Sequence, residues 1–166
     1  MFETDSELTE LQALLDASLS RSTGHLRSIV DNRLTAAQLS SALSGMCVLA
    51  VATVTADGEP RISAVDGHFW HGRWVFGTAG TAAKAQHLRA RPAVSVAHIR
   101  GEELGVFSHG TAEMLYPGDH PDWPAVLDHL TKHYGESPLS FGDDIVYYRL
   151  QPTWMVVYGG AGQVGS

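Results

Sequence analysis

Thr78, Thr81 and Lys84 lie close together in the run F-G-T-A-G-T-A-A-K. Gly80 predicts a turn after an apolar strand, Thr81 can cap a following helix, and Pro92 must end that helix. Lys84 then falls in the first helical turn, where the positive end of the helix dipole disfavours a cation. A phosphate bound to the free amides, a threonine hydroxyl and the Lys84 ammonium would reverse that preference. A solvated surface lysine explains the local pattern equally well.

The charges of the chain are unevenly distributed. Eighteen acidic residues against 11 basic ones give a net charge of −7, which argues against a general nucleic-acid or anionic-membrane surface. Between residues 58 and 101, however, six basic residues face only two acidic ones. The six are Arg61, Arg73, Lys84, Arg89, Arg91 and Arg100. A local site for an anionic ligand explains this surplus, and chance together with ordinary arginine solvation is the alternative.

Other groups that could do chemistry favour structural roles. Asp66 and His68 share one face of a predicted strand, where we expect a structural hydrogen bond more than a contact to a ligand. His129 and His133 are one helical turn apart, but without an evident third ligand they are interpreted as a solvent-facing pair, and no metal site is predicted. Cys47, the single cysteine, lies in an apolar run and should be a buried, inert thiol. No nucleophile elbow, P-loop or catalytic triad is recognisable, so catalytic residues stay unassigned.

The elements that must position these residues change in type along the chain. Leucines at helical spacing predict a helix over residues 5–20, and Thr35 with Gln38 forms a capping-box pattern before a second helix that Gly45 can end. From Met46 onward, apolar runs separated by Asp-Gly and Gly turns predict strands, interrupted by helices after Gly80 and over residues 121–133. Four aromatic residues on two neighbouring strands should belong to the core: Phe69, Trp70, Trp74 and Phe76.

These elements predict a mainly β fold, a six- to seven-stranded antiparallel split β-barrel with N-terminal helices. Residues 1–45 would form a helical extension, residues 46–160 the cofactor-binding barrel, and residues 161–166 a flexible tail. The sequence shows neither a secretory signal nor an apolar run long enough to span a membrane, so a cytoplasmic location is expected.

The ordered combination D-G-E-P-R-I-S-A-V, R-W-V-F-G-T, a lysine six residues after Thr78, and H-L-R-A-R-P-A-V-S-V resembles the flavin-binding split barrel of pyridoxamine-phosphate-oxidase-like proteins. That superfamily includes flavin- and deazaflavin-dependent oxidoreductases, and the similarity covers roughly residues 46–116. The resemblance implies that Thr78 and Lys84 hold a cofactor phosphate. It also implies a homodimer with cofactors between the subunits, as a barrel too small to enclose a flavin would require.

The chain departs from the oxidase pattern at several positions. Ala82 replaces a serine of the phosphate site, the second strand reads I-S-A-V-D-G-H-F without the expected lysine, and the C-terminus lacks the arginine and histidine motif for the substrate phosphate. Oxidation of pyridoxamine phosphate itself is therefore not expected. The departures also leave open a non-enzymatic flavin or haem carrier on the same barrel.

The resulting prediction is an oxidoreductase with a small-molecule substrate that binds FMN or the deazaflavin coenzyme through Thr78, Thr81 and Lys84. Ser63, with the neighbouring Ile62 and Ala64, is expected to contact the cofactor ring, and Arg61 adds positive charge. The deazaflavin is favoured over FMN because its polyanionic tail needs a longer cationic track, which the basic residues between 58 and 101 could provide.

Overall fold

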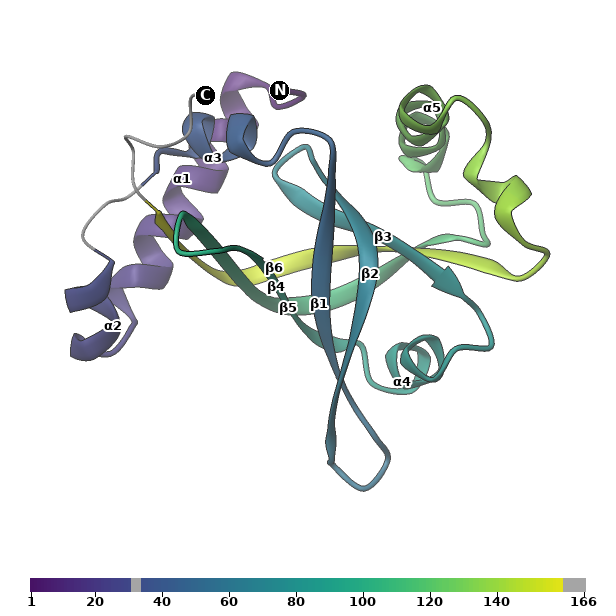
Figure 1. The fold of residues 1–166 in the computed structure, drawn as a ribbon, viewed down its shortest axis with the longest axis horizontal. Coiled ribbons are helices and arrows are strands. Elements are labelled where there is room, and N and C mark those ends of the chain that lie inside the picture. Colours follow the sequence, from purple (N-terminus) through teal and green to yellow (C-terminus); the bar gives the residue numbers. More distant parts are fainter. Residues whose placement is uncertain (31–33, 160–166) are drawn as a thin grey trace.

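The computed structural model describes residues 1–30 and 34–159, and the predicted tail at 161–166 lies outside them. Before the barrel come α1 (Asp5–Ser20), α2 (Gly24–Ile29) and α3 (Ala36–Ala42). The barrel and its connections comprise β1 (Met46–Val54), β2 (Pro60–Trp70), β3 (Arg73–Ala79), α4 (Ala83–Ala90), β4 (Ala93–Arg100), β5 (Leu104–Tyr116), α5 (Trp123–Tyr134), the short 3₁₀ helix η1 (Pro138–Phe141) and β6 (Ile145–Gly159). The predicted mainly β fold with flanking helices is confirmed, with six strands (Figure 1).

The six strands close into an antiparallel barrel in the order β1-β2-β3-β6-β5-β4, with β4 returning to β1. Most neighbours are consecutive in the chain and pair as hairpins, as the Asp-Gly and Gly turns predict. The pairing of β3 with β6 joins segments far apart in sequence and places Gly77 opposite Tyr147. This pairing closes the barrel and brings the end of β3 beside the start of β6.

Strand alternation decides which side chains fill the barrel. Along β1, Cys47, Leu49 and Val51 are buried, whereas Met46 and Val48 on the opposite face are exposed. Phe69, Trp74 and Phe76 belong to the interior core, as predicted. Trp70 is also buried, but on the outside of the barrel.

The N-terminal helices cover one end of the barrel (Figure 1). In α1, Leu11, Leu15 and Leu19 form the predicted buried stripe against the barrel. The capping box of Thr35 and Gln38 is present at the start of α3, which ends before Gly45. Helix α2 was not predicted from the sequence. It has no buried residue, which explains why apolar periodicity did not indicate it.

Helix α5 and η1 lie between β5 and β6 in the chain and cover the outside of the barrel (Figure 1). A second apolar cluster joins them to outward-facing side chains of the strands. Its buried members are Trp70, Val75, Leu115, Trp123, Val126, Leu130 and Tyr147. The parts of β2, β3 and β6 that carry these side chains are therefore enclosed beneath α5. None of the described helices is long and apolar enough to cross a lipid bilayer.

Candidate functional site

The turn between β3 and α4 brings Thr78 and Lys84 together. The Lys84 ammonium donates a hydrogen bond of 3.4 Å to the Thr78 hydroxyl, from the first turn of α4. Thr81 is not the helix cap, because α4 begins one residue later with Ala82 as its N-cap. The Thr81 carbonyl instead accepts a hydrogen bond from the Gln86 side chain, and its own side chain is exposed. The prediction that Thr81 caps the helix is therefore wrong.

The N-termini of α1, α2 and α3 have side-chain cap hydrogen bonds, whereas those of α4 and α5 have none, and at α4 the N-cap is Ala82. The amides of a first helical turn have no partner within the helix, so an outside acceptor can bind them here. A second cation reaches the same turn: Arg89 donates to the Gly80 carbonyl at 2.7 Å. A Cβ atom on Gly80 would collide with the Asp144 carboxylate and lie 3.0 Å from Arg89, so a larger residue here would displace these side chains.

The six basic residues between 58 and 101 do not form one track. Arg91 donates to the Val54 carbonyl beside α4, whereas Arg100 donates to the Ala42 carbonyl next to α3. Arg73 lies against α1. Helices α1 and α3 lie at one end of the barrel, away from α4 (Figure 1). The expected continuous track is thus divided between the two ends of the barrel, because residues near in sequence lie at opposite ends of its strands.

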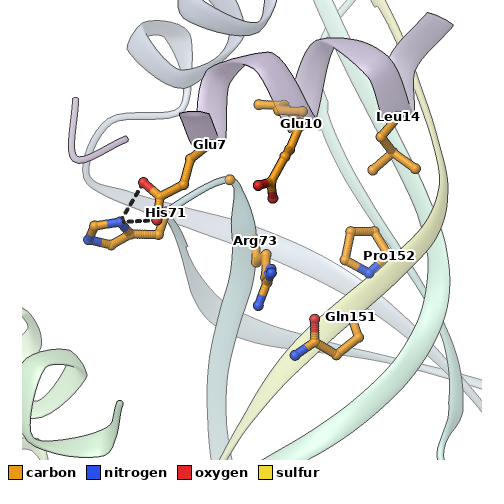
Figure 2. Close-up of a pocket in the computed structure, with 9 residues that line it drawn as sticks. Glu7, Glu10, Leu14, His71, Arg73, Gln151 and Pro152 are labelled. Atoms are coloured by element: carbon orange, nitrogen blue, oxygen red, sulfur yellow. Dashed lines mark hydrogen bonds and ion pairs between the residues drawn. The ribbon is translucent and has the colours of Figure 1, made fainter. Parts of the chain in front are cut away.

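Figure 2 shows where Arg73 lies, in a cavity of about 190 Å³ between α1 and the turn joining β2 to β3. Glu7 forms an ion pair of 2.8 Å with His71 at one side of this cavity. Glu10 and Arg73 both project into it (Figure 2). Arg73 therefore faces acidic groups of α1 and not the β3–α4 turn.

The predicted ring contacts at Arg61, Ile62, Ser63 and Ala64 fall on two faces of β2. Ser63 is directly opposite the fully buried Val51, so it shares the interior face. Arg61 continues that face towards the barrel end and pairs with Glu59 at 2.6 Å. Ile62, 75% exposed, and Ala64 face outwards. Strand alternation therefore prevents all four side chains from contacting one side of a ring.

The outward face of β2 leads from Ile62 and Ala64 to Asp66 and His68, and the last two line a cavity. This cavity has a volume of about 470 Å³ and lies between the barrel and the α5–η1 segment. Its other lining residues are Val75, Phe76, Gly77, Thr78, Ala79, Leu130, Tyr134, Phe141, Gly142, Asp143, Asp144, Ile145 and Tyr147. Thr78 thus belongs both to the cavity and to the β3–α4 turn.

The histidines of α5 pack against His68. His129 lies 3.3 Å from Nδ1 of His68, and the ring of His133 stands edge-on to the same imidazole at 4.7 Å. The interpretation of a solvent-facing pair is therefore wrong for His129, which is half-buried, whereas His133 is exposed as expected. His68 bonds to His129 and Tyr134, not to Asp66. Burial and the two neighbouring imidazoles lower the pKa of His68 to about 4, so it is neutral at physiological pH. No group of three ligands suited to a metal ion occurs among the described residues.

Sequence reasoning did not find the cavity or the roles of Tyr134 and Tyr147 in it. The available signal was the pair of Gly77 and Tyr147, a small residue opposite a large one. The Tyr147 ring packs against Gly77 so closely that a Cβ atom there would be only 2.7 Å from it. Recognising this pair requires the β3–β6 register, which no local motif specifies. Cys47 is buried as predicted, and that burial raises the pKa of its thiol.

Arg149, the one arginine after residue 100, is held in a structural network. Its guanidinium lies 2.9 Å from Glu113 and 2.7 Å from Asp122, and Gln151 also donates to Glu113. Burial alone would raise the pKa of Glu113, but hydrogen bonds from His120, Arg149 and Gln151 lower it to about 2. Arg149 is thus engaged in joining β5, β6 and the start of α5.

Comparison with known proteins agrees with this geometry. The family model described as pyridoxamine 5'-phosphate oxidase matches residues 36–152. No curated protein sequence matches the chain.

Among solved structures, the haem storage protein HutZ from Vibrio cholerae is similar with a TM-score of 0.64 and 24% identity, over 76% of this chain and 97% of that one. An F420 reductase is similar with a TM-score of 0.53 and 26% identity, over 69% of this chain and 93% of that one. The conserved hypothetical protein Rv2991 from Mycobacterium tuberculosis gives a TM-score of 0.63 and 19% identity, over 78% of this chain and 87% of that one.

Proposed function

Because the chain belongs to the pyridoxamine 5'-phosphate oxidase family, we propose that it is an oxidoreductase that binds the phosphate of a flavin-type cofactor at the β3–α4 turn. The observation that carries the proposal is the contact of the Lys84 ammonium with Thr78, beside a helix start without a side-chain cap. Amides, a hydroxyl and an ammonium are the donors that a phosphate needs. Thr81, exposed next to this turn, can add its hydroxyl.

When bound, a flavin-type cofactor supplies the hydride chemistry. The residues of this chain then have binding and positioning roles. Thr78 and Lys84 would hold the phosphate, with the Lys84 ammonium offsetting its charge, and Arg89 fixes the turn through the Gly80 carbonyl. Ile62 and Ala64 offer an apolar outer surface to the ring, which ends at the cavity containing Asp66. No side chain of the turn needs to act as an acid or base.

The proposed assembly is a homodimer with the cofactor at its interface. Support comes from an apolar outer face of β1, β2 and β4, where Val48 is 56% exposed, Ile62 75% and Ile99 58%. Large apolar side chains gathered on one exposed face are typical of a protein interface. The same face carries a depression of about 620 Å³ that includes Val48 and Ile99. A second copy of the chain seated there would cover both the face and a ring lying on β2.

The deazaflavin coenzyme is the cofactor we favour over FMN. The similar F420 reductase supports this choice. Arg61, Lys84, Arg89 and Arg91 lie at the barrel end with α4 and could meet a polyanionic tail, whereas Arg73 and Arg100 lie too far along the strands to contribute. The cationic surface available is thus shorter than the sequence suggests. This weakens the preference for the deazaflavin over FMN.

The absorbance spectrum of the purified protein tests the proposal, because a flavin, a deazaflavin and a haem absorb in distinguishable bands. Titration of apo protein with FMN and with the deazaflavin, at low and high salt, then identifies the cofactor. We expect salt-sensitive deazaflavin binding, since contacts to a polyanionic tail are screened. Tighter FMN binding would overturn the preference. A haem spectrum with neither flavin bound would instead indicate a haem carrier, for which the likeness to HutZ supports the fold alone.

A further inference from the structure

The cavity beneath α5 has aromatic walls. Tyr134 and Phe141 form its outer side, edge to face at 5.8 Å, and Tyr147 lies on the barrel side. Leu130, Val75 and Ile145 add apolar surface. A volume of about 470 Å³ accommodates a small organic molecule. The walls are therefore suited to a compact ligand with apolar or π surface.

The ionised groups of this cavity are all negative. Asp66 stands on β2, and Asp143 and Asp144 lie on the segment entering β6. No lysine or arginine is among the lining residues. His68, the remaining titratable base there, is kept neutral by burial and by the neighbouring imidazoles, which lower its pKa to about 4. A phosphate or carboxylate would therefore be repelled beside Asp66, away from the β3–α4 turn where Lys84 meets Thr78.

Tyr147 adds a polar group that lacks a partner. The residue is only 8% exposed, its side chain lines the cavity, and its hydroxyl forms no hydrogen bond with any residue that the structure describes. Burial, with Tyr134 and Asp66 nearby, raises the pKa of Tyr147 to about 12, so the hydroxyl stays protonated. Because the hydroxyl is open to the cavity, it can hydrogen-bond a ligand there.

We propose that the cavity between α5–η1 and strands β2, β3 and β6 binds a small organic cation, with Asp66 opposing its charge and Tyr147 accepting a hydrogen bond from its nitrogen. The faces of Tyr134, Tyr147 and Phe141 add the attraction of π systems for cations. This assignment of a substrate class rests on the proposed oxidoreductase function. As the substrate site of that enzyme, the cavity would select an amine without phosphate. Such a substrate differs from the pyridoxamine 5'-phosphate of the family name.

Three probes of similar shape and different charge test the cavity: 2-phenylethylammonium, 2-phenylethanol and phenylacetate. Ligand-observed NMR titrations would use the full chain without added cofactor. We expect the cation to bind most tightly and phenylacetate least. Asp66→Asn should weaken binding of the cation about twofold to fivefold, because Asp66 is exposed and solvent screens its attraction for the cation. Tyr147→Phe should weaken it about twofold to tenfold.

Asp57→Asn is the matched control, since it removes the same charge at the exposed turn between β1 and β2. Circular dichroism of each variant verifies folding. Equal affinity for phenylacetate and the cation, equal losses in Asp66→Asn and Asp57→Asn, or no cation binding at all would overturn the proposal. Selective cation binding by a protein that takes up neither flavin would support the cation site and overturn the oxidoreductase proposal alone.

Discussion

The imidazole of His68 on β2 lies 2.9 Å from the hydroxyl of Tyr134 on α5, so one hydrogen bond joins the barrel to the helix that covers the cavity. The His68 ring is 2% exposed and also meets His129 at 3.3 Å. Further titratable or charged groups around these rings are Asp66, His71, Asp128 and His133. Because His68 is neutral and closely packed, adding a proton to it would disturb the attachment of α5.

We therefore expect acid to destabilise the protein through His68. The pKa of this histidine falls from its ordinary 6.5 to about 4 on folding, so the unfolded chain takes up the proton first. Its contribution is complete above pH 6.5 and is lost as the pH falls towards 4, with a slope of at most about 1.4 kcal/mol per pH unit. Urea denaturation of His68→Gln should show a flatter pH dependence than wild type. Unchanged dependence in His68→Gln, or equal flattening in the exposed-site control His25→Gln, would contradict this explanation.

Glu113→Gln should destabilise the protein at neutral pH by about 1–3 kcal/mol, because Arg149 is 7% exposed and would lose one of its two carboxylate partners. The folded-state pKa of Glu113 is lowered to about 2, so its contribution is present above pH 4.5 and is lost as the pH falls towards 2. The free energies of unfolding of wild type and variant should converge in acid. Denaturant titrations beside the exposed-site control Glu102→Gln check this, and a constant difference down to low pH would refute it.

Lys84→Ala should weaken cofactor binding about tenfold to a hundredfold, the effect expected for a lost charge-assisted hydrogen bond to phosphate. Lys132→Ala is the control, since Lys132 is exposed and pairs with Asp128 on α5. Fluorescence-quenching titrations of both variants measure the difference. Equal affinities would place the phosphate elsewhere.

Ile62→Asp should convert the proposed dimer to a monomer, because it would bury a carboxylate in the apolar face of β1, β2 and β4. Ile29→Asp makes the same change at a residue 54% exposed on α2, and it should leave the assembly intact. Sedimentation velocity at micromolar concentration distinguishes the two. A monomeric wild type under cofactor-saturated conditions would refute the interface site.

The barrel could be predicted because most of its pairings are local. The Asp57–Gly58 turn and the turn at His71–Gly72 announce two hairpins, and strand alternation then fixes which side chains enter the core. The β3–β6 pairing is set by the closure of the whole barrel, and the cavity depends on it. The Gly77–Tyr147 contact was therefore invisible to local motifs.

In the candidate site, too, only contacts between residues close in sequence could be predicted. Thr78 and Lys84 are joined by one turn, so their spacing alone indicated a shared location. His68 lies 61 residues before His129, and only the packing of α5 on the barrel brings them together. Arg73 and Arg100 show the converse. They are close in sequence to Lys84 and Arg91, but the length of a strand places them at the other end of the barrel.

The α5–η1 segment is inserted between two strands that already pair with each other. Tyr116 near the end of β5 lies directly opposite Tyr147 near the start of β6, so a short turn could join these strands without it. Exchanging α5 and η1 could change the volume of the cavity and its aromatic wall. Asp144 would have to be kept, because its carbonyl accepts a hydrogen bond from the Gly80 amide in the β3–α4 turn. In such a fold, ligand preference can change through changes in the sequence of this insertion, while the pairing of the barrel strands is kept.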